Sequence, residues 1–437
     1  MLATLRKSEL SATAFALAFV ILFSSVLLWP AFLNRYPLID WDSNAYVDTI
    51  THWRGPTRPF PYSVFLLLTS FHRSAWGTVI AQALLVSTIN WFTLLTVCVP
   101  ASSLDHSPSH RGCSTGVPFR RLIIPAVIVV VACAVSALPY YTSLIMPDLF
   151  TLTAILALFV LLYTPSRFRA GFAFGLLALS ISIHGSNAPI LAILVGLWVF
   201  WYRRRRWLLA CAAIGLGLLL GGAIHKIMTG KLYWRELGST VPFARLLQDG
   251  LIQQTLEVSC HEEPNPFCPY TEELRGITSD LYIWSPYSVR YRIGNERQAA
   301  ERALIFRSLR LFPVENASAV WRHLVRGFDL TIDTYYPIHS VTFPFRGIVK
   351  KALPADVKAF ERAIQLNREE WYPEARLVIT RLTWVAILLS LVELCEFGIG
   401  ARSISPLAFG FGVGAVVGGV SLPNAAVGSA HCAAVAC

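Results

Sequence analysis

Long apolar runs recur along this 437-residue chain, and they constrain its fold more than any other feature. A helix needs about 17–25 mostly apolar residues to cross the hydrocarbon core of a bilayer. Apolar segments that approach or reach this length lie at residues 11–33, 76–100, 122–140, 148–163, 170–183, 188–202, 207–224, 377–397 and 404–426. The sequence therefore predicts an all-α polytopic membrane protein with about nine transmembrane helices. A shorter run, residues 62–71, suits a re-entrant or interfacial element instead.

Composition favours a membrane protein over a soluble one. Hydrophobic residues make up 55% of the chain and charged residues only 14%, against about 25% charged residues in soluble domains. The first apolar run is longer than a signal-peptide core of about 7–15 residues and lacks a small-residue cleavage site, so we expect a retained helix. Much of the net charge of +11 resides in short clusters between the apolar runs. These clusters lack interleaved aromatic residues, which argues against nucleic acid as a partner.

The basic clusters predict the orientation of the helices. Cytoplasmic loops of membrane proteins carry an excess of Lys and Arg. A cytoplasmic N-terminus puts the clusters at residues 111–121, 167–169 and 203–206 on the cytoplasmic side. The extracytoplasmic side then receives the polar loops at residues 34–75, 139–150, 182–187 and 225–376. We thus expect a multi-pass protein of the inner (plasma) membrane whose polar loops share the extracytoplasmic face.

The chain divides into three predicted parts. Residues 1–225 form an N-terminal transmembrane core that includes a polar first external loop at residues 34–75. Residues 226–376 form an extracytoplasmic, mostly helical domain, in which the apolar spacing predicts two helices separated by Pro313. Residues 377–437 hold the C-terminal transmembrane helices.

Two of the nine cysteines lie in the predicted external domain. Cys260 and Cys268 flank prolines in "VSCHEEPNPFCPY", where the chain is expected to turn. On an oxidising outer face a disulfide that closes this loop is expected, with two free thiols as the alternative.

The first external loop opens with "DWDSNAYVDTITHW", which carries Asp40, Asp42 and Tyr46. Alternation places the two Asp side chains on one face of an extended segment. From Asp42 onward the pattern predicts a short helix, capped by Asp42 or Ser43, with an aromatic side toward the membrane interface. The carboxylates either cap and solvate this helix or act as proton acceptors at the membrane edge, and these residues alone leave both interpretations open.

Basic side chains follow the acids. In "RGPTRPFPYSVF", prolines constrain Arg54 and Arg58 near the bilayer surface, and Arg suits bidentate contact with phosphate oxygens. Lys231 and Arg235 follow the seventh apolar run beside two aromatic residues. That arrangement suits either an anionic head group or plain interfacial anchoring.

Two further polar positions lie on the same predicted face. Asp148, in "LIMPDLF", precedes the fourth apolar run, where it either caps that helix or serves as a functional carboxylate that faces protein or water. His184, in "SIHGSN", lies near the end of the fifth run, where a histidine is either structural or functional. The sequence contains no P-loop, HExxH or GxSxG motif.

The order of these features resembles the GT-C superfamily of membrane glycosyltransferases. The resemblance rests on Asp42 with Tyr46 four residues later, on "RPFPYSVFLL" and on Asp148 before the fourth span, and it covers roughly the first 240 residues. More narrowly, "LIMPDLF", "FARLLQDG" and "LYIWSP" look like an uncharacterised bacterial membrane-protein family of this architecture. Where the superfamily commonly has an Asp-Glu pair, this chain has Asp42-Ser43.

The resemblance implies a polyprenyl-phosphate-linked sugar as donor, with membrane lipids around it, and an envelope glycan, lipid or protein as acceptor. It implies a catalytic first external loop, with Asp42, Asp40 and Asp148 as catalytic residues. The expected substrate contacts are Tyr46, His184, Arg54, Arg58, Lys231 and Arg235. A divalent cation, Mg²⁺ or Mn²⁺, is a candidate cofactor that Asp42 and Asp148 would hold through oxygen ligands.

Other functions share some of these features. A lipid-linked glycan ligase or polymerase would use a similar loop, and a non-catalytic scaffold for envelope assembly would tolerate the loss of Asp42. A transporter typically places ionisable residues or broken helices in the middle of its spans. Here the spans are nearly free of acids and bases away from their ends, with Glu393 and Glu396 as the exceptions, which disfavours transport.

Overall fold

The computed structural model describes residues 2–52, 60–98, 120–134, 136–185, 187–202, 205–230, 238–327 and 342–367. These residues are mostly helical, as predicted, and the extended pairing found among them is an isolated bridge between Leu38 and Leu144. The chain divides into two compact units: unit 1 (Met1–Tyr233 with Pro337–Gly418) and unit 2 (Trp234–Tyr336 with Gly419–Cys437). The predicted C-terminal helices, residues 377–437, lie outside the described residues.

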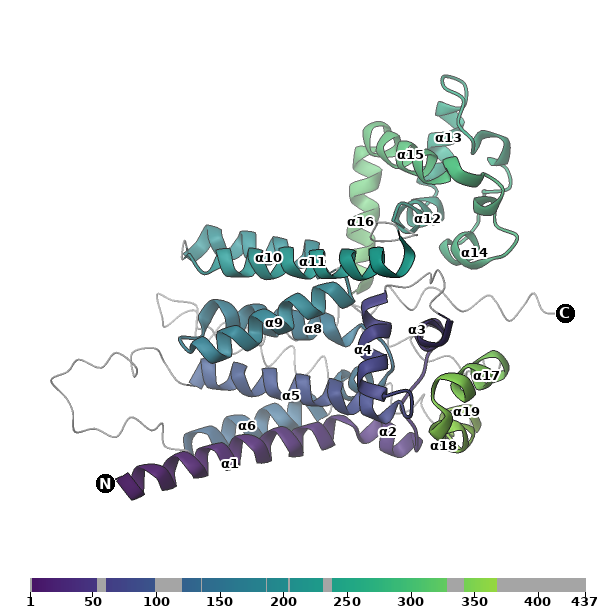
Figure 1. Ribbon diagram of the computed structural model, residues 1–437. Helices are drawn as coiled ribbons and strands as arrows, with labels where there is room; N and C mark the ends of the chain where they lie inside the picture. Colours follow the sequence, from purple (N-terminus) through teal and green to yellow (C-terminus); the bar gives the residue numbers. More distant parts are fainter. Residues whose placement is uncertain are drawn as a thin grey trace. The chain divides into compact units, whose positions relative to one another are not determined.

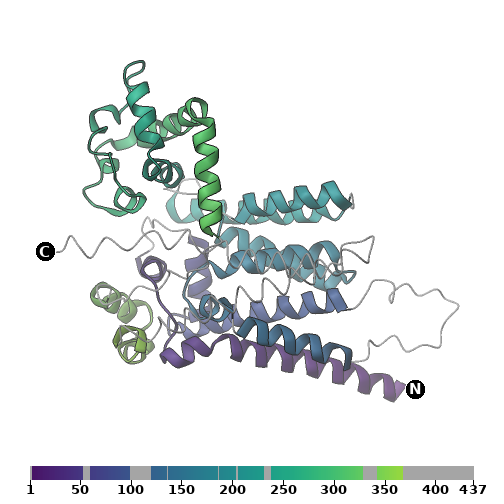
Figure 2. The ribbon, with the colours of Figure 1, turned by 180° about the vertical axis from the view of Figure 1, so that it is seen from behind.

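Long helices form a bundle in unit 1, seen from one side in Figure 1 and from behind in Figure 2. They are α1 (Leu2–Leu27), α5 (Trp76–Cys98), α6 (Arg120–Ala134), α8 (Leu149–Tyr163), α9 (Arg167–Ile183), α10 (Asn187–Tyr202) and α11 (Trp207–Thr229). In the bundle α1 packs on α5, α5 on α8, α8 on α9, and α9 on α11. Helix α8 is apolar on every side and almost entirely buried, as a helix inside a bundle must be.

Helices α9 and α11 approach each other closely at Gly217. A Cβ atom at this glycine would lie 2.6 Å from the carbonyl oxygen of Ala178 and 2.7 Å from Cβ of Ile181. Small residues at helix contacts allow such close packing between apolar helices. Gly217 therefore sets the distance between these two helices.

Within the described part of the chain, two helices, α5 and α11, are long and apolar enough to cross a membrane; each has 23 residues. Shorter apolar helical stretches lie at Thr13–Leu27, Phe60–Ser70, Leu122–Ala134, Leu149–Tyr163 and Asn187–Phe200. These lengths and compositions weakly support association with a membrane. The count of nine spans and the orientation stay predictions.

Short helices gather at one end of the bundle (Figure 1). They are α2 (Trp29–Asn34), α3 (Trp41–His52), α4 (Phe60–Ser70), α7 (Leu138–Ser143), α17 (Thr342–Ala352), α18 (Val357–Glu361) and α19 (Ile364–Asn367), with a 3₁₀ turn at Pro354–Asp356. Helix α17 packs on α3. Residues 342–367, called the returning segment below, were grouped by sequence with the external domain, but they pack in unit 1.

Unit 2 is a small helical unit with its own apolar core. Its helices are α12 (Thr240–Gln248), α13 (Leu251–Ser259), α14 (Ser279–Trp284), α15 (Arg297–Leu311) and α16 (Pro313–Gly327), with 3₁₀ turns at Cys268–Tyr270, Val289–Tyr291 and Gly294–Glu296. The rings of Phe243 and Phe267 stack at 4.8 Å, and Tyr282 packs beside them. A disulfide joins Cys260 to Cys268 and closes the loop after α13.

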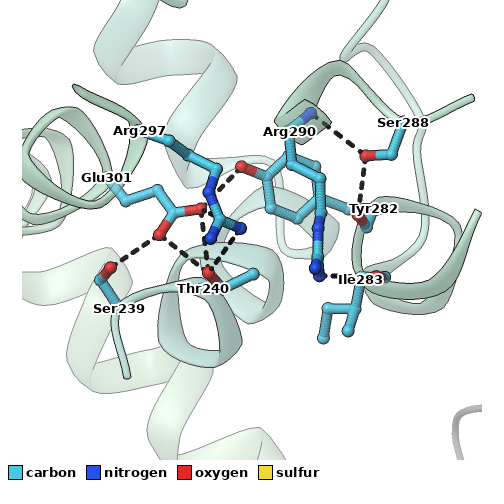
Figure 3. Close-up of polar contacts among 8 residues, drawn as sticks. All are labelled: Ser239, Thr240, Tyr282, Ile283, Ser288, Arg290, Arg297 and Glu301. Atoms are coloured by element: carbon cyan, nitrogen blue, oxygen red, sulfur yellow. Dashed lines mark hydrogen bonds and ion pairs between the residues drawn. The ribbon is translucent and has the colours of Figure 1, made fainter. Parts of the chain in front are cut away.

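A fully buried carboxylate lies in the core of unit 2 (Figure 3). Glu301 accepts hydrogen bonds from the hydroxyls of Ser239 at 2.7 Å, Thr240 at 3.0 Å and Tyr282 at 2.9 Å. The guanidinium of Arg297, one turn earlier on α15, lies 3.8 Å away. Burial and the Glu301 carboxylate raise the pKa of Tyr282 far above its ordinary value, so the phenol stays protonated and keeps donating. The buried charge is stabilised by donors from three parts of the unit.

Candidate functional site

The first loop, which follows α1 and begins at residue 34, lies against the segment that leads into α8. The N–H of Leu38 donates to the carbonyl of Ser143 at 2.8 Å, and the N–H of Ile145 donates to the carbonyl of Leu38 at 3.0 Å. Asp40 follows this bridge on one segment and Asp148 follows it on the other. Two acid-bearing segments that are far apart in the sequence are therefore neighbours in the fold.

A serine makes a second link between these segments. Helix α3 begins at Trp41, so Asp42 and Ser43 both lie in its first turn, and the prediction that one of them caps the helix is wrong. Instead, the Ser43 hydroxyl accepts a hydrogen bond from the N–H of Asp40 at 2.9 Å and donates to the carbonyl of Ile145 at 3.0 Å. Ser43 is the third residue of α3 and reaches back to the N–H of the residue before the helix, as the third-position side chain of a capping box does. The carboxylate of Asp42 is half-buried at the start of the helix.

Asp148 occupies the N-cap position of α8, but its side chain makes no capping hydrogen bond. The carboxylate is half-buried. One turn into α8, the hydroxyl of Thr151 donates to the side-chain oxygen of Asn187 at 2.8 Å. That contact draws the turn between α9 and α10, which contains the half-buried His184, to the same end of the bundle. The side chain of Asp148 therefore does not serve as the cap of α8.

Two tyrosines pack between the first loop and α5. The rings of Tyr46 and Tyr62 meet edge to face at 4.8 Å, and the Tyr62 hydroxyl donates to Oε1 of Gln82 at 2.8 Å. The amide of Gln82 donates in turn to the carbonyl of Leu144 at 3.0 Å. Tyr62 lies on α4, which has 11 residues and is too short to cross a membrane. Burial, the neighbouring Tyr46 and the Asp148 carboxylate all raise the pKa of Tyr62, so its hydroxyl remains a donor.

The returning segment is attached to the first loop by a buried carboxylate. Oδ2 of Asp356 accepts hydrogen bonds from the hydroxyl of Tyr36 at 3.1 Å and from the N–H of Ala75 at 2.7 Å. Burial and the charge of Asp356 raise the pKa of Tyr36 well above its usual value. One carboxylate therefore joins the returning segment to residues on both sides of α3 and α4.

A buried amide makes a second attachment. The side chain of Gln365 accepts from the N–H of Ile39 at 3.2 Å and donates to the carbonyl of Ile39 at 2.6 Å. The N–H of Gln365 donates to the side-chain oxygen of Asn34 at 2.7 Å. These contacts fix the backbone next to Asp40. Sequence reasoning missed Asp356 and Gln365, because a single polar residue in a mixed segment carries no signal of a distant partner.

The predicted site residues fall into two groups. The structure brings Asp40, Asp42, Asp148 and Tyr46 together at one end of unit 1, with His184 at the same end. The four predicted phosphate contacts lie outside the described residues: Arg54, Arg58, Lys231 and Arg235. Within the described part of the chain, no group of three or more His, Cys, Asp or Glu side chains could hold a metal ion. A divalent cation held by Asp42 and Asp148 stays a prediction.

Comparison of the chain with protein-family models, with curated proteins and with solved structures finds no match. The resemblance to the GT-C superfamily thus stays a prediction from the sequence motifs.

Proposed function

We propose that this chain is a GT-C-type membrane glycosyltransferase. It moves a sugar from a polyprenyl-phosphate carrier to an envelope glycan, lipid or protein acceptor. The observation that carries the proposal is the backbone pairing of Leu38 with Leu144, which makes neighbours of the segments that bear Asp40, Asp42 and Asp148. Several carboxylates close to a membrane edge suit proton abstraction and orientation of an acceptor hydroxyl.

In the proposed reaction Asp42 is the general base. It takes the proton from the acceptor hydroxyl while the acceptor oxygen attacks the anomeric carbon of the donor sugar. The bond between that carbon and the phosphate oxygen breaks, the electron pair leaves with the lipid phosphate, and the configuration inverts. Asp40 or Asp148 orients the acceptor; the half-burial of all three carboxylates leaves them within reach of a substrate.

The negative charge that develops on the lipid phosphate needs compensation. Arg58 supplies it, with Arg54, Lys231 or Arg235 as helpers, because preorganised cations stabilise charge that develops in the transition state. A divalent cation bound by Asp42 and Asp148 would supply the same neutralisation, and hard carboxylate oxygens fit Mg²⁺ or Mn²⁺. His184, which is half-buried, contacts the substrate, and Tyr46, which is buried against Tyr62, supports the helix that carries Asp42.

The proposal includes a membrane topology. About nine helices cross the inner membrane, the N-terminus is cytoplasmic, and the site faces the extracytoplasmic side. The short helix α4 lies at the interface and lines the entry for the prenyl chain. The apolar character of α4, and its length of 11 residues, support an interfacial position.

Transfer of radiolabelled sugar from polyprenyl-phosphate sugars in isolated membranes tests the proposal. The native protein, Asp42→Asn and Asp48→Asn are compared at equal expression. Asp48 is a matched control, because it lies on the same helix, is 44% exposed and pairs with His52 at 2.8 Å. We expect Asp42→Asn to lower transfer by about 10²–10⁴-fold, the usual contribution of a general base, and Asp48→Asn to remain close to native.

Each other outcome has a definite meaning. Native-like transfer by Asp42→Asn would remove Asp42 from the chemistry. Absence of transfer in the native protein with all carrier-linked sugars supplied would contradict the glycosyltransferase and favour transport or scaffolding. Transfer of preassembled oligosaccharides rather than single sugars would identify a ligase or polymerase.

A further inference from the structure

Helix α16 turns its apolar side away from unit 2. The side that faces α15 holds the buried residues Asn316 and Ala319, and the Asn316 amide donates to the carbonyl of Ser308 at 3.1 Å. The other side carries exposed apolar residues, with exposed fractions of 74% for Val314, 67% for Val320 and 64% for Trp321. A surface helix normally buries its apolar stripe in its own domain. Here the stripe has no partner within unit 2 among the described residues.

We call Val314, Ala317, Val320 and Trp321 the outer face of α16. Their spacing of three or four residues places them on one side of the helix. The preceding helix, α15, also leaves large apolar side chains exposed, with 64% of Phe306 and 47% of Leu309 accessible. Exposed apolar side chains in this number mark a site of contact with a protein or a membrane.

The exposed charges of α15 and α16 that flank this face in the sequence are mainly positive. Between residues 302 and 323, the exposed charged side chains are those of Arg302, Arg310, Arg322 and Glu315. A fifth charged residue, Arg307, is paired with Glu262 and Glu263. Three exposed Arg side chains and one exposed Glu side chain give a net positive charge, which complements an anionic surface better than a neutral or cationic one.

The length of the chain keeps unit 2 close to a membrane if α11 crosses it. Helix α11 ends at Thr229 and α12 begins at Thr240. The intervening ten residues, 230–239, span at most about 36 Å when fully extended. A short tether of this kind holds a unit at a high effective concentration next to its target. A bilayer that α11 crosses is therefore an apolar surface within reach of unit 2.

We propose that the outer face of α16 lies in the interface of the membrane and binds a lipid surface that contains anionic phospholipids. A helix with an apolar side and flanking Arg side chains lies in the plane of such an interface, and Trp is favoured at that depth. The proposal rests on α11 crossing the membrane and is independent of glycosyl transfer.

Photo-crosslinking of the full-length protein in lipid nanodiscs tests this contact. A photoreactive amino acid replaces Val320, and a control protein carries it in place of Glu272, which is 82% exposed elsewhere in unit 2. In discs of phosphatidylcholine with phosphatidylglycerol we expect lipid adducts at position 320 to exceed those at position 272 several-fold. The thermal unfolding midpoint should match the native value, because Val320 lies outside the core of the unit.

Varying the charge of the lipid tests the electrostatic contribution of Arg322 to this contact. Arg322→Gln should lower the lipid adducts at position 320 about fivefold in discs with phosphatidylglycerol and leave them unchanged in phosphatidylcholine alone, since one Arg near an anionic surface contributes about that factor. Equal adducts in both lipids for native and variant would contradict the preference for anionic lipid.

Three results would overturn the membrane contact. They are adducts between position 320 and a second copy of the chain, adducts with residues 368–437 of the same chain, and lipid adducts at position 320 no more abundant than at position 272.

Discussion

Asp356 in unit 1 and Glu301 in unit 2 are both buried carboxylates that accept a hydrogen bond from a tyrosine, yet they join different kinds of partner. The partners of Asp356 are Tyr36 and Ala75, which lie 320 and 281 positions earlier in the chain. The partners of Glu301 are between 4 and 62 positions away, all within unit 2. Asp356 therefore holds the returning segment against the first loop, whereas Glu301 holds neighbouring helices of one unit together.

Because their partners differ, we expect Glu301 to affect the stability of unit 2 and Asp356 to affect the candidate site. Loss of Glu301 should loosen unit 2 and leave the candidate site of unit 1 as it is. Loss of Asp356 should loosen the loop that carries Asp40 and Asp42. Both buried carboxylates differ from Asp40, Asp42 and Asp148, which are only half-buried and so can be reached by a substrate.

The largest effect on stability is expected for Glu301→Ala. It leaves the Arg297 guanidinium and three hydroxyls without their buried acceptor, and breaking a buried pair in this way costs about 3–5 kcal/mol. Hydrogen exchange of the full-length protein should show faster exchange in α12, α14 and α15 but not in α3. Glu272→Ala, at an exposed position, is the control. Equal loss of protection in both units would contradict the local role of Glu301.

The next largest effect is expected for Asp356→Asn. The amide oxygen of Asn is uncharged and a weaker acceptor for Tyr36 and Ala75 than the carboxylate, so we expect a loss of about 1–3 kcal/mol. Exchange should accelerate in residues 36–50 and 342–367, and sugar transfer should fall. Glu361→Gln is the matched control, since Glu361 forms a surface pair with Arg346. Unchanged exchange around residue 40 would refute the attachment of the returning segment.

A smaller, pH-dependent effect is expected for Tyr36→Phe and Tyr282→Phe. The folded state raises the pKa of both phenols above their unfolded values, so their contribution is complete below about pH 10 and is lost as the pH rises further. The native protein should therefore lose up to about 1.4 kcal/mol of stability per pH unit for each tyrosine above pH 10. Circular dichroism at pH 8–11 should show each variant to be less stable at pH 8 but less sensitive to alkali. Parallel curves for native and variant proteins would contradict this account.

The smallest effect is expected for Arg275→Ala. Arg275 is 61% exposed and pairs with Glu257 and Glu272 on the surface of unit 2. Exposed pairs contribute about 0–1 kcal/mol, because solvent screens the charges. The thermal midpoint should shift by no more than a few degrees, and a shift as large as that of Glu301→Ala would remove the contrast between buried and exposed pairs.

The sequence predicted the helices better than it predicted their contacts. Hydropathy predicted the helices α5, α8 and α11, because every residue of an apolar helix contributes to the hydropathy of its segment. Local patterns also placed Asp42 in a short helix, although α3 begins at Trp41, one residue before the predicted start. The contacts of Asp356 and Gln365 were not predictable, since they depend on partners hundreds of residues away.

The central claim is that the first loop and the segment before α8 form one site, and a designed disulfide between Leu38→Cys and Leu144→Cys tests it most directly. Paired residues of a bridge lie within the Cα separation of 4.4–6.8 Å that a disulfide usually spans. In membranes, mass spectrometry should find the crosslinked peptide without added substrate, and sugar transfer should persist in the crosslinked protein. The single variants Leu38→Cys and Leu144→Cys are the controls and should give no crosslinked peptide. Failure of the 38–144 pair to crosslink would contradict the account.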